Sequence, residues 1–149
     1  MTESTTFACA FCKVANRELP ARLVFEDELS LAFLDHRPVF PGHCLLIPKI
    51  HHETLTDLPE DLVGPLFKRA QLLARAVESA LEAHGTFVAM NNRVSQSVPH
   101  LHVHIVPRRR KDGLKGFFWP RYPYPADEAA DAVQLSIRDA LASLNSKVF

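Results

Sequence analysis

The stretch that decides the fold is HLHVHIV, residues 100–106. Successive side chains of a β-strand point to opposite faces, so a strand here carries three imidazoles on one face. Leu101, Val103 and Ile105 then share the other face, and we expect that face to pack against a helix. The segment therefore predicts a strand with one buried apolar face and one face that gathers three histidines.

His100, His102 and His104 have three alternative roles. A single metal ion bound by all three is disfavoured, because the strand rises about 3.3 Å per residue and separates the outer two by about 13 Å, whereas zinc ligands lie only a few ångströms apart. A solvated polar face would require three imidazoles by coincidence. Phosphate chemistry fits better, since a neutral imidazole is a nucleophile near neutral pH, and its phosphoramidate divides one displacement into two easier steps.

Hydrophobic periodicity around this strand predicts an α+β domain. The expected elements, in chain order, are strands at 23–25, 30–34 and 43–48, a long helix from about residue 65, strands at 86–90 and 100–106, and a final helix within 126–144. Strands followed by one long helix and further strands indicate a mainly antiparallel sheet covered by that helix.

Local signals predict where the elements begin and end. Asp57 and Glu60 resemble a capping box, and Gly64-Pro65 interrupts the pattern that follows, so we expect a short turn at 59–63 before the long helix. Gly85 is expected to end that helix. Pro107 is expected to end the last strand, because proline has no N–H to donate.

Composition limits the kind of protein. The chain has 149 residues, 47% of them hydrophobic, which suits one domain with a sizeable core. Seventeen basic and 17 acidic residues give zero net charge, which disfavours a general nucleic-acid binder. No apolar run approaches the roughly 20 residues of a membrane span, and the polar start lacks a signal-peptide core. We therefore expect a cytoplasmic protein with no membrane partner, and its three cysteines do not suggest a disulfide framework.

The motif of three histidines separated by apolar residues resembles the signature of the histidine triad family. Two further segments carry the resemblance, DHRPVFPGH at 35–43 and LIPKIH at 46–51, and the triad itself lies in QSVPHLHVHIVPR at 96–108. The likeness covers about residues 9–110. It implies the family's HIT-like fold, an antiparallel five-stranded sheet with one long helix. It also implies a single domain over 1–149 with a C-terminal extension from about 111, and a homodimer formed through the helix and a sheet edge.

The resemblance also implies a nucleotide substrate and a role for each site residue. His102 would be the nucleophile, His104 would contact the phosphate, and His43 would lie close to the triad. Four further positions match residues that bind nucleotide in the family: Asp35 for the ribose hydroxyls, Ser97 and Gln96 for phosphate, and Asn91 or Asn92 for phosphate.

Cys9 and Cys12 have the spacing of half a structural zinc site. Several bacterial members of the family complete such a site with two histidines. The resemblance therefore implies that His51, with His52 as the alternative, and His100 are the other ligands. Four protein ligands leave no open position, so this zinc would be structural and would tie the N-terminus to the sheet.

The substrate is predicted from the residues after the triad. Arg108 lies beside the expected phosphate site, where its charge can attract and bind a polyphosphate chain, although a charged turn exposed to solvent is the alternative. It follows a proline, as in relatives that cleave dinucleoside polyphosphates, whereas relatives that act on phosphoramidates more often carry two glycines there. We therefore expect hydrolysis at the α-phosphate of a dinucleoside polyphosphate through a nucleotidyl-histidine. The alternatives are a nucleoside phosphoramidase, a nucleotidyl transferase, or a nucleotide-binding sensor without turnover, although a pure binder needs no nucleophile. The aromatic cluster at 116–122 is expected to pack onto the domain or a dimer partner.

Overall fold

The computed structural model describes residues 8–115 and 121–148, with side chains up to residue 144. The chain divides into two compact units, residues 1–112 and 113–149, which are described separately. Three aromatic residues for which packing was expected, Phe117, Phe118 and Trp119, lie outside the described residues.

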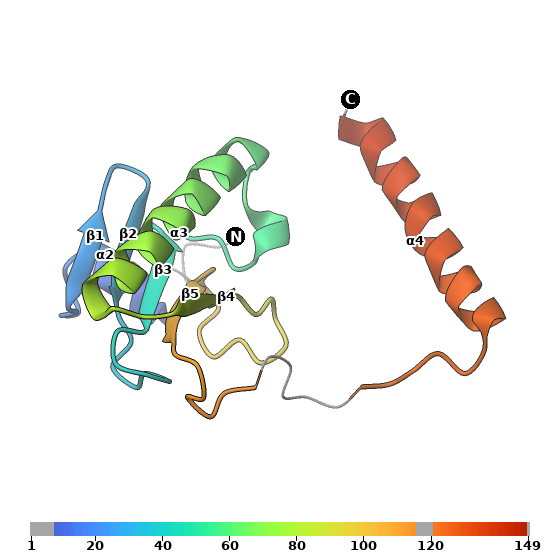
Figure 1. The fold of residues 1–149 in the computed structure, drawn as a ribbon. Helices are drawn as coiled ribbons and strands as arrows, with labels where there is room; N and C mark the ends of the chain where they lie inside the picture. Colours follow the sequence, from blue (N-terminus) through green and yellow to red (C-terminus); the bar gives the residue numbers. More distant parts are fainter. Residues whose placement is uncertain (1–7, 116–120, 149) are drawn as a thin grey trace. The chain divides into compact units, whose positions relative to one another are not determined.

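The first unit is built on a five-stranded antiparallel sheet with the strand order β1-β2-β3-β5-β4 (Figure 1). The strands are β1 (Leu23–Glu26), β2 (Ser30–Leu34), β3 (Cys44–Pro48), β4 (Gly85–Ala89) and β5 (Val103–Arg108). The helices are α2 (Ala10–Ala15), the short 3-10 helix η1 (Leu55–Asp57) and the long helix α3 (Glu60–Leu81). The predicted α+β fold with one long helix is therefore confirmed.

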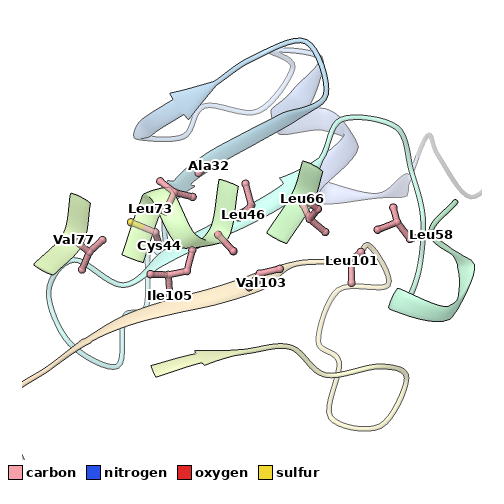
Figure 2. Packing of buried hydrophobic residues seen from close by; sticks show 11 residues of the cluster. Ala32, Cys44, Leu46, Leu58, Leu66, Leu73, Val77, Leu101, Val103 and Ile105 are labelled. Atoms are coloured by element: carbon pink, nitrogen blue, oxygen red, sulfur yellow. The ribbon is translucent and has the colours of Figure 1, made fainter. Parts of the chain in front are cut away.

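Apolar side chains cover both faces of this sheet. On one face, Leu46, Val103 and Ile105 pack with Leu66 and Leu73 of α3 (Figure 2). The other face carries a smaller cluster: Val14 from α2, Leu31 and Phe33 from β2, and Leu45 and Ile47 from β3. The alternation predicted for 100–106 is confirmed, and the histidine side of that segment is also largely covered.

The strand in the triad segment begins and ends later than predicted. His100–His102 precede β5, which starts at Val103 and continues through Pro107. The carbonyl of Arg108 accepts the N–H of His84 on the β4 side, so Pro107 directs its backbone to the opposite side. Pairing of β5 with β3 has ended there, at Ile105. A missing N–H therefore costs the sheet no hydrogen bond, and the expectation that Pro107 ends the strand was wrong.

The start of α3 also differs from the prediction. The helix begins at Glu60 and runs through Pro65 without a separate turn. Proline removes only the hydrogen bond to the carbonyl of Asp61, whose exposed position leaves that carbonyl to water. The expected capping box at 57 and 60 is wrong by one turn: the Asp57 carboxylate accepts the N–H and hydroxyl of Thr54, and together they cap η1.

The end of α3 is set by a long-range contact rather than by Gly85. Glu82 takes the left-handed conformation, with φ 50°, at the helix end. The guanidinium of Arg109 donates to the carbonyls of Leu81 and Glu82. Because these carbonyls have a cationic donor, no glycine is needed, and Gly85 becomes the first residue of β4.

The second unit contains the helix α4 (Asp127–Val148), which extends four residues beyond the predicted range of 126–144. Val133, Ile137, Leu141 and Leu144 recur along it at helical spacing and are exposed. Across the described parts of the chain, the search for a helix that could cross a bilayer finds none.

Candidate active site and metal centre

The ring of His102 is fixed in one tautomer by the backbone. Its Nδ1 lies 2.7 Å from the carbonyl oxygen of His100. A carbonyl only accepts hydrogen bonds, so Nδ1 carries the proton and Nε2 keeps its lone pair. Among the described residues, Nε2 of His102 makes no hydrogen bond, although the residue is only 3% exposed. In the neutral ring, Nε2 is therefore the nitrogen whose lone pair is available to a ligand.

A chain of hydrogen bonds sets the opposite tautomer in His104. The N–H of Val39 donates to Nδ1 of His43, so the neutral His43 ring carries its proton on Nε2. That proton is donated to Nδ1 of His104 over 2.9 Å. His104 must then carry its own proton on Nε2, where it is available to a phosphoryl oxygen.

Burial keeps both rings of this relay neutral. It lowers the pKa of His43, against the opposing effect of Asp35. It also lowers the pKa of His104 to about 4, with smaller contributions from His102 and His43. The relay is therefore complete at neutral pH without any charged imidazole.

Asp35 lies beside the relay, in the loop that precedes His43. One carboxylate oxygen accepts the N–H of Arg37, and the other lies 3.7 Å from Nδ1 of His43. The side chain is 17% exposed. Its second oxygen can accept hydrogen bonds from a ligand, which is consistent with the role in ribose binding predicted from the resemblance.

Four predicted metal ligands converge on one buried point. The ligand atoms of Cys9, Cys12, His51 and His100 all lie within 4.8 Å of one another. Nδ1 of His100 is 3.4 Å from Sγ of Cys9, and Nδ1 of His51 is 3.2 Å from Sγ of Cys12. The structure brings His51 into this group and leaves His52 outside it.

The donor set fits zinc in geometry and in chemistry. Zinc bonds of about 2.1 Å to nitrogen and 2.3 Å to sulfur place tetrahedral ligands about 3.4–3.8 Å apart, close to the observed separations. Nε2 of His100 donates to the carbonyl of Pro48 over 2.8 Å. This bond leaves the lone pair on Nδ1, the atom that faces the cysteines.

Electrostatics favour a cation at this point. Burial raises the pKa of Cys12 to about 12, and Cys9 adds to the effect. Burial lowers the pKa of His100 to about 4. The Cys12 thiol would therefore remain protonated unless a cation compensated its charge, while the imidazole of His100 is already in the neutral form that binds metals.

His100 joins the two sites. Its ring belongs to the cysteine and histidine cluster, and its backbone carbonyl accepts the Nδ1–H of His102. Any metal bound at the cluster would therefore fix the residue that orients His102.

Two of the predicted phosphate ligands make hydrogen bonds that hold the loop before the triad in place. Gln96 accepts the N–H of Arg93 and donates to the carbonyl of Glu53. Asn92 accepts the N–H of Leu55. These two amides tie the loop to the start of η1. Gln96 uses both ends of its amide in this way, whereas Asn92 uses only its carbonyl oxygen, and their part in phosphate binding stays a prediction.

Ser97 and Asn91 are the remaining candidates in this loop. Ser97 is exposed and lines a cavity of about 300 Å³ together with Cys9 and His51. Asn91 donates from Nδ2 to the carbonyl of Ser95, and its Oδ1 makes no hydrogen bond within the described chain. Their part in phosphate binding stays a prediction.

Arg108 is paired within the protein. Its Nε and Nη2 donate to the two carboxylate oxygens of Asp112 over 2.7 and 3.0 Å. These hydrogen bonds raise the pKa of the guanidinium, but the carboxylate balances its charge. This pairing weakens the argument that Arg108 attracts a polyphosphate chain.

Phe11 was not singled out in the sequence, although the structure places it against the triad. Its ring packs edge-to-face with the rings of His102 and His100, at centroid distances of 5.1 and 6.0 Å. The available signal was its position between the two cysteines, which brings it to the cluster if they bind a metal.

The half-buried ring of His104 predicts a loss of stability in acid. The unfolded chain takes up a proton near pH 6.5, whereas the folded chain does so only near pH 4. Between these values the unfolded state binds more protons, so the free energy of unfolding falls as the pH is lowered through this range.

Urea unfolding of the wild type and of His104→Asn at pH 7.5 and 5.0 measures this contribution. The variant is expected to lose less stability between the two pH values. The difference between the proteins removes contributions that they share, including any from bound metal. Equal losses in both proteins would contradict the prediction.

The chain matches a known protein family and is similar to several of its members. The family model described as the HIT domain matches residues 16–111. The adenylylsulfatase HINT3 of Arabidopsis thaliana is 32% identical, over 95% of this chain and 75% of that protein. The adenosine 5'-monophosphoramidase HNT1 of Saccharomyces cerevisiae is 36% identical, over 70% of this chain and 67% of that protein. A solved zinc-bound histidine triad family protein from Mycobacterium smegmatis is 37% identical with a TM-score of 0.70, over 95% and 98% of the two chains.

Proposed function

Since the chain belongs to the HIT domain family, we propose that it is a hydrolase that transfers a nucleoside monophosphoryl group first to His102 and then to water. The observation that carries the proposal is the tautomer of His102, whose Nδ1–H is bound by the carbonyl of His100 while Nε2 is left free. A nucleotide-binding sensor would need no such orientation.

The first step forms a nucleotidyl-histidine. The lone pair of Nε2 of His102 attacks the α-phosphorus and forms an N–P bond. The bond from phosphorus to the leaving group breaks, and its electron pair departs with that group. An amine leaving group also takes a proton, which the solvent supplies, while the Nε2–H of His104 donates a hydrogen bond to a phosphoryl oxygen. The carbonyl of His100 stabilises the positive charge that develops on the imidazole ring.

The second step returns the enzyme to its starting state. A water oxygen attacks the same phosphorus and gives up a proton, the N–P bond breaks, and its electron pair returns to Nε2 of His102. A nucleoside monophosphate is released. The proton that the water gives up passes to the solvent, and His104 keeps its Nε2–H throughout.

We propose a nucleotide with a single small group on its α-phosphate, a phosphoramidate or an adenylyl sulfate, as the substrate class. This differs from the dinucleoside polyphosphate expected from Arg108. Two observations support the change: the two relatives named above are an adenylylsulfatase and a monophosphoramidase, and Asp112 already pairs with Arg108.

The test compares kcat/KM for adenosine 5'-phosphoramidate, adenylyl sulfate and diadenosine triphosphate. We expect at least about a 100-fold preference for one of the first two, and Arg108→Gln should leave that activity nearly unchanged. A rapid acid or alkaline quench should also trap one nucleotide per chain. Faster cleavage of diadenosine triphosphate would contradict the substrate class, and absence of a trapped adduct during turnover would contradict the mechanism.

The cysteine and histidine cluster completes the proposal. Cys9, Cys12, His51 and His100 would hold a structural zinc ion, with no part in the bond-breaking steps. The buried donor set and the zinc-bound neighbour from Mycobacterium smegmatis support this assignment. The ion would supply the positive charge that lets both thiols ionise.

A further inference from the structure

We propose that Phe11 is a positioning residue of this reaction, whose ring holds the imidazole of His102 at the angle from which Nε2 attacks. The proposal rests on the proposed function, because it takes His102 as the nucleophile. Phe11 would act through the imidazole and not through contact with the substrate.

The ring of Phe11 makes contacts with three other aromatic rings. Its ring lies 5.1 Å from that of His102 with an interplanar angle of 84°, and 6.0 Å from that of His100 at 71°. A third edge-to-face contact joins it to Phe33 at 5.3 Å and 70°. Perpendicular aromatic pairs are favourable because the positive edge of one ring meets the negative face of the other. Phe11 is therefore oriented by one aromatic neighbour and orients two imidazoles.

The backbone around Phe11 is tied on both sides. Cys9 precedes it by two residues and Cys12 follows it directly, and both are buried members of the ligand cluster. The N–H of Cys12 donates to Sγ of Cys9 over 3.4 Å. The N–H of Lys13 donates to the carbonyl of Cys9 over 3.1 Å. The first turn of α2 cannot move without disturbing the cluster, so the Phe11 ring is held at a fixed position.

The nucleophile needs such a second contact. The hydrogen bond from Nδ1 of His102 to the carbonyl of His100 fixes one atom of the ring, but the ring can still tilt about that bond. A tilt displaces Nε2, the atom that must meet phosphorus in line with the leaving group. Misplacement of a reacting atom by about 1 Å can cost about 100-fold in rate. Packing against Phe11 restricts the tilt.

The experiment replaces the ring while keeping apolar volume. Phe11→Leu removes the aromatic edge and face, and Phe11→Tyr restores them. The matched control is Phe25→Leu, which truncates a partly buried phenylalanine that packs against the cluster beneath α3, away from Phe11 and Phe33. Zinc content and melting temperature are measured for each variant, so that a loss of the metal or of the fold is recognised.

The expected result is a kinetic change confined to the chemical step. In rapid-quench experiments, Phe11→Leu should form the nucleotidyl-histidine about tenfold more slowly, with unchanged KM and zinc content. Phe11→Tyr and Phe25→Leu should remain within about twofold of the wild type. A normal rate in Phe11→Leu would overturn the proposal, as would a rise in KM without a fall in rate, or a tenfold loss in Phe25→Leu.

A second measurement does not depend on the reaction. Proton NMR of the free protein, with histidine labelled by ¹³C and ¹⁵N, should show that the Cε1 proton of His102 loses its ring-current shift in Phe11→Leu and keeps it in Phe11→Tyr. An unchanged shift would overturn the contact. If the wild type forms no nucleotidyl adduct at all, the proposed function fails, and the NMR result reports separately whether Phe11 orients the imidazole.

Discussion

Replacement of His102 by asparagine is expected to lower the turnover number by at least about 1,000-fold, because it removes the nucleophile of a two-step displacement. Asparagine is chosen for a structural reason. Its amide N–H can replace the Nδ1–H that donates to the carbonyl of His100, so that carbonyl keeps a donor and the fold should persist. The variant should still bind the nucleoside monophosphate product with a dissociation constant within about threefold of the wild type.

The measurement combines single-turnover kinetics with mass spectrometry of the quenched protein. The wild type should gain the mass of one nucleotide, located on residue 102, and His102→Asn should gain none. His84→Asn is the matched control, because His84 lies at the surface and its Nδ1 accepts the N–H of Arg110, a bond that asparagine can also accept. Normal hydrolysis by His102→Asn, or an adduct on another histidine in the wild type, would remove His102 from its assigned role.

The local pattern at 100–106 predicted the sheet well because strand alternation depends only on neighbouring residues. The strand at 30–34 was predicted with its observed bounds, and β3 begins one residue later than expected. Buried side chains at Leu101, Val103 and Ile105 confirm the assignment of faces. Where the chain is extended and one face is apolar, sequence spacing is sufficient information.

The errors occur where a distant residue supplies a partner. Arg109 binds the carbonyls at the end of α3, so the glycine rule for helix ends did not apply. Pro107 is tolerated because β3 has stopped pairing at that level. Neither fact is visible from neighbouring residues, since each depends on which strand or helix end lies opposite.

In the candidate site too, local spacing predicted part of the arrangement, and distant partners determined the rest. The spacing of Cys9 and Cys12 marked half of a metal site, but His100 lies 91 residues from Cys9 and was linked to it by family resemblance alone. Gln96 and Arg108 were predicted as ligands from their positions. The structure pairs Gln96 with the Glu53 carbonyl and Arg108 with Asp112. Residue type indicates what a side chain can bind, but the fold determines what it does bind.

Replacement of Cys12 by alanine is expected to abolish zinc binding and to lower the melting temperature by about 10 °C. In small metal sites the free energy of metal binding is also free energy of folding. A loss of about 3–5 kcal/mol shifts the melting temperature by roughly 10 °C in a domain of this size. The wild type purified without added zinc should contain about one zinc per chain, and Cys12→Ala less than a tenth of that.

The matched control is Cys44→Ala, which truncates another buried thiol. Cys44 is 3% exposed and packs in the cluster beneath α3, on the opposite face of the sheet from Phe33 and Leu45. Its Sγ donates to the carbonyl of Gly42. It should keep the metal and lose only a few degrees of melting temperature. Equal losses in both variants, or a wild type without zinc whose Cys9 and Cys12 are freely alkylated, would contradict the metal site.

A chelator distinguishes loss of the metal from loss of the side chain. It should lower the melting temperature of the wild type to that of Cys12→Ala and leave the variant unchanged. The turnover number should fall in parallel, although zinc takes no part in the chemistry, because His100 binds the metal through its ring and orients His102 through its carbonyl. Loss of zinc with full activity would show that His102 is positioned independently of the cluster, because His100 would then have lost its metal without consequence.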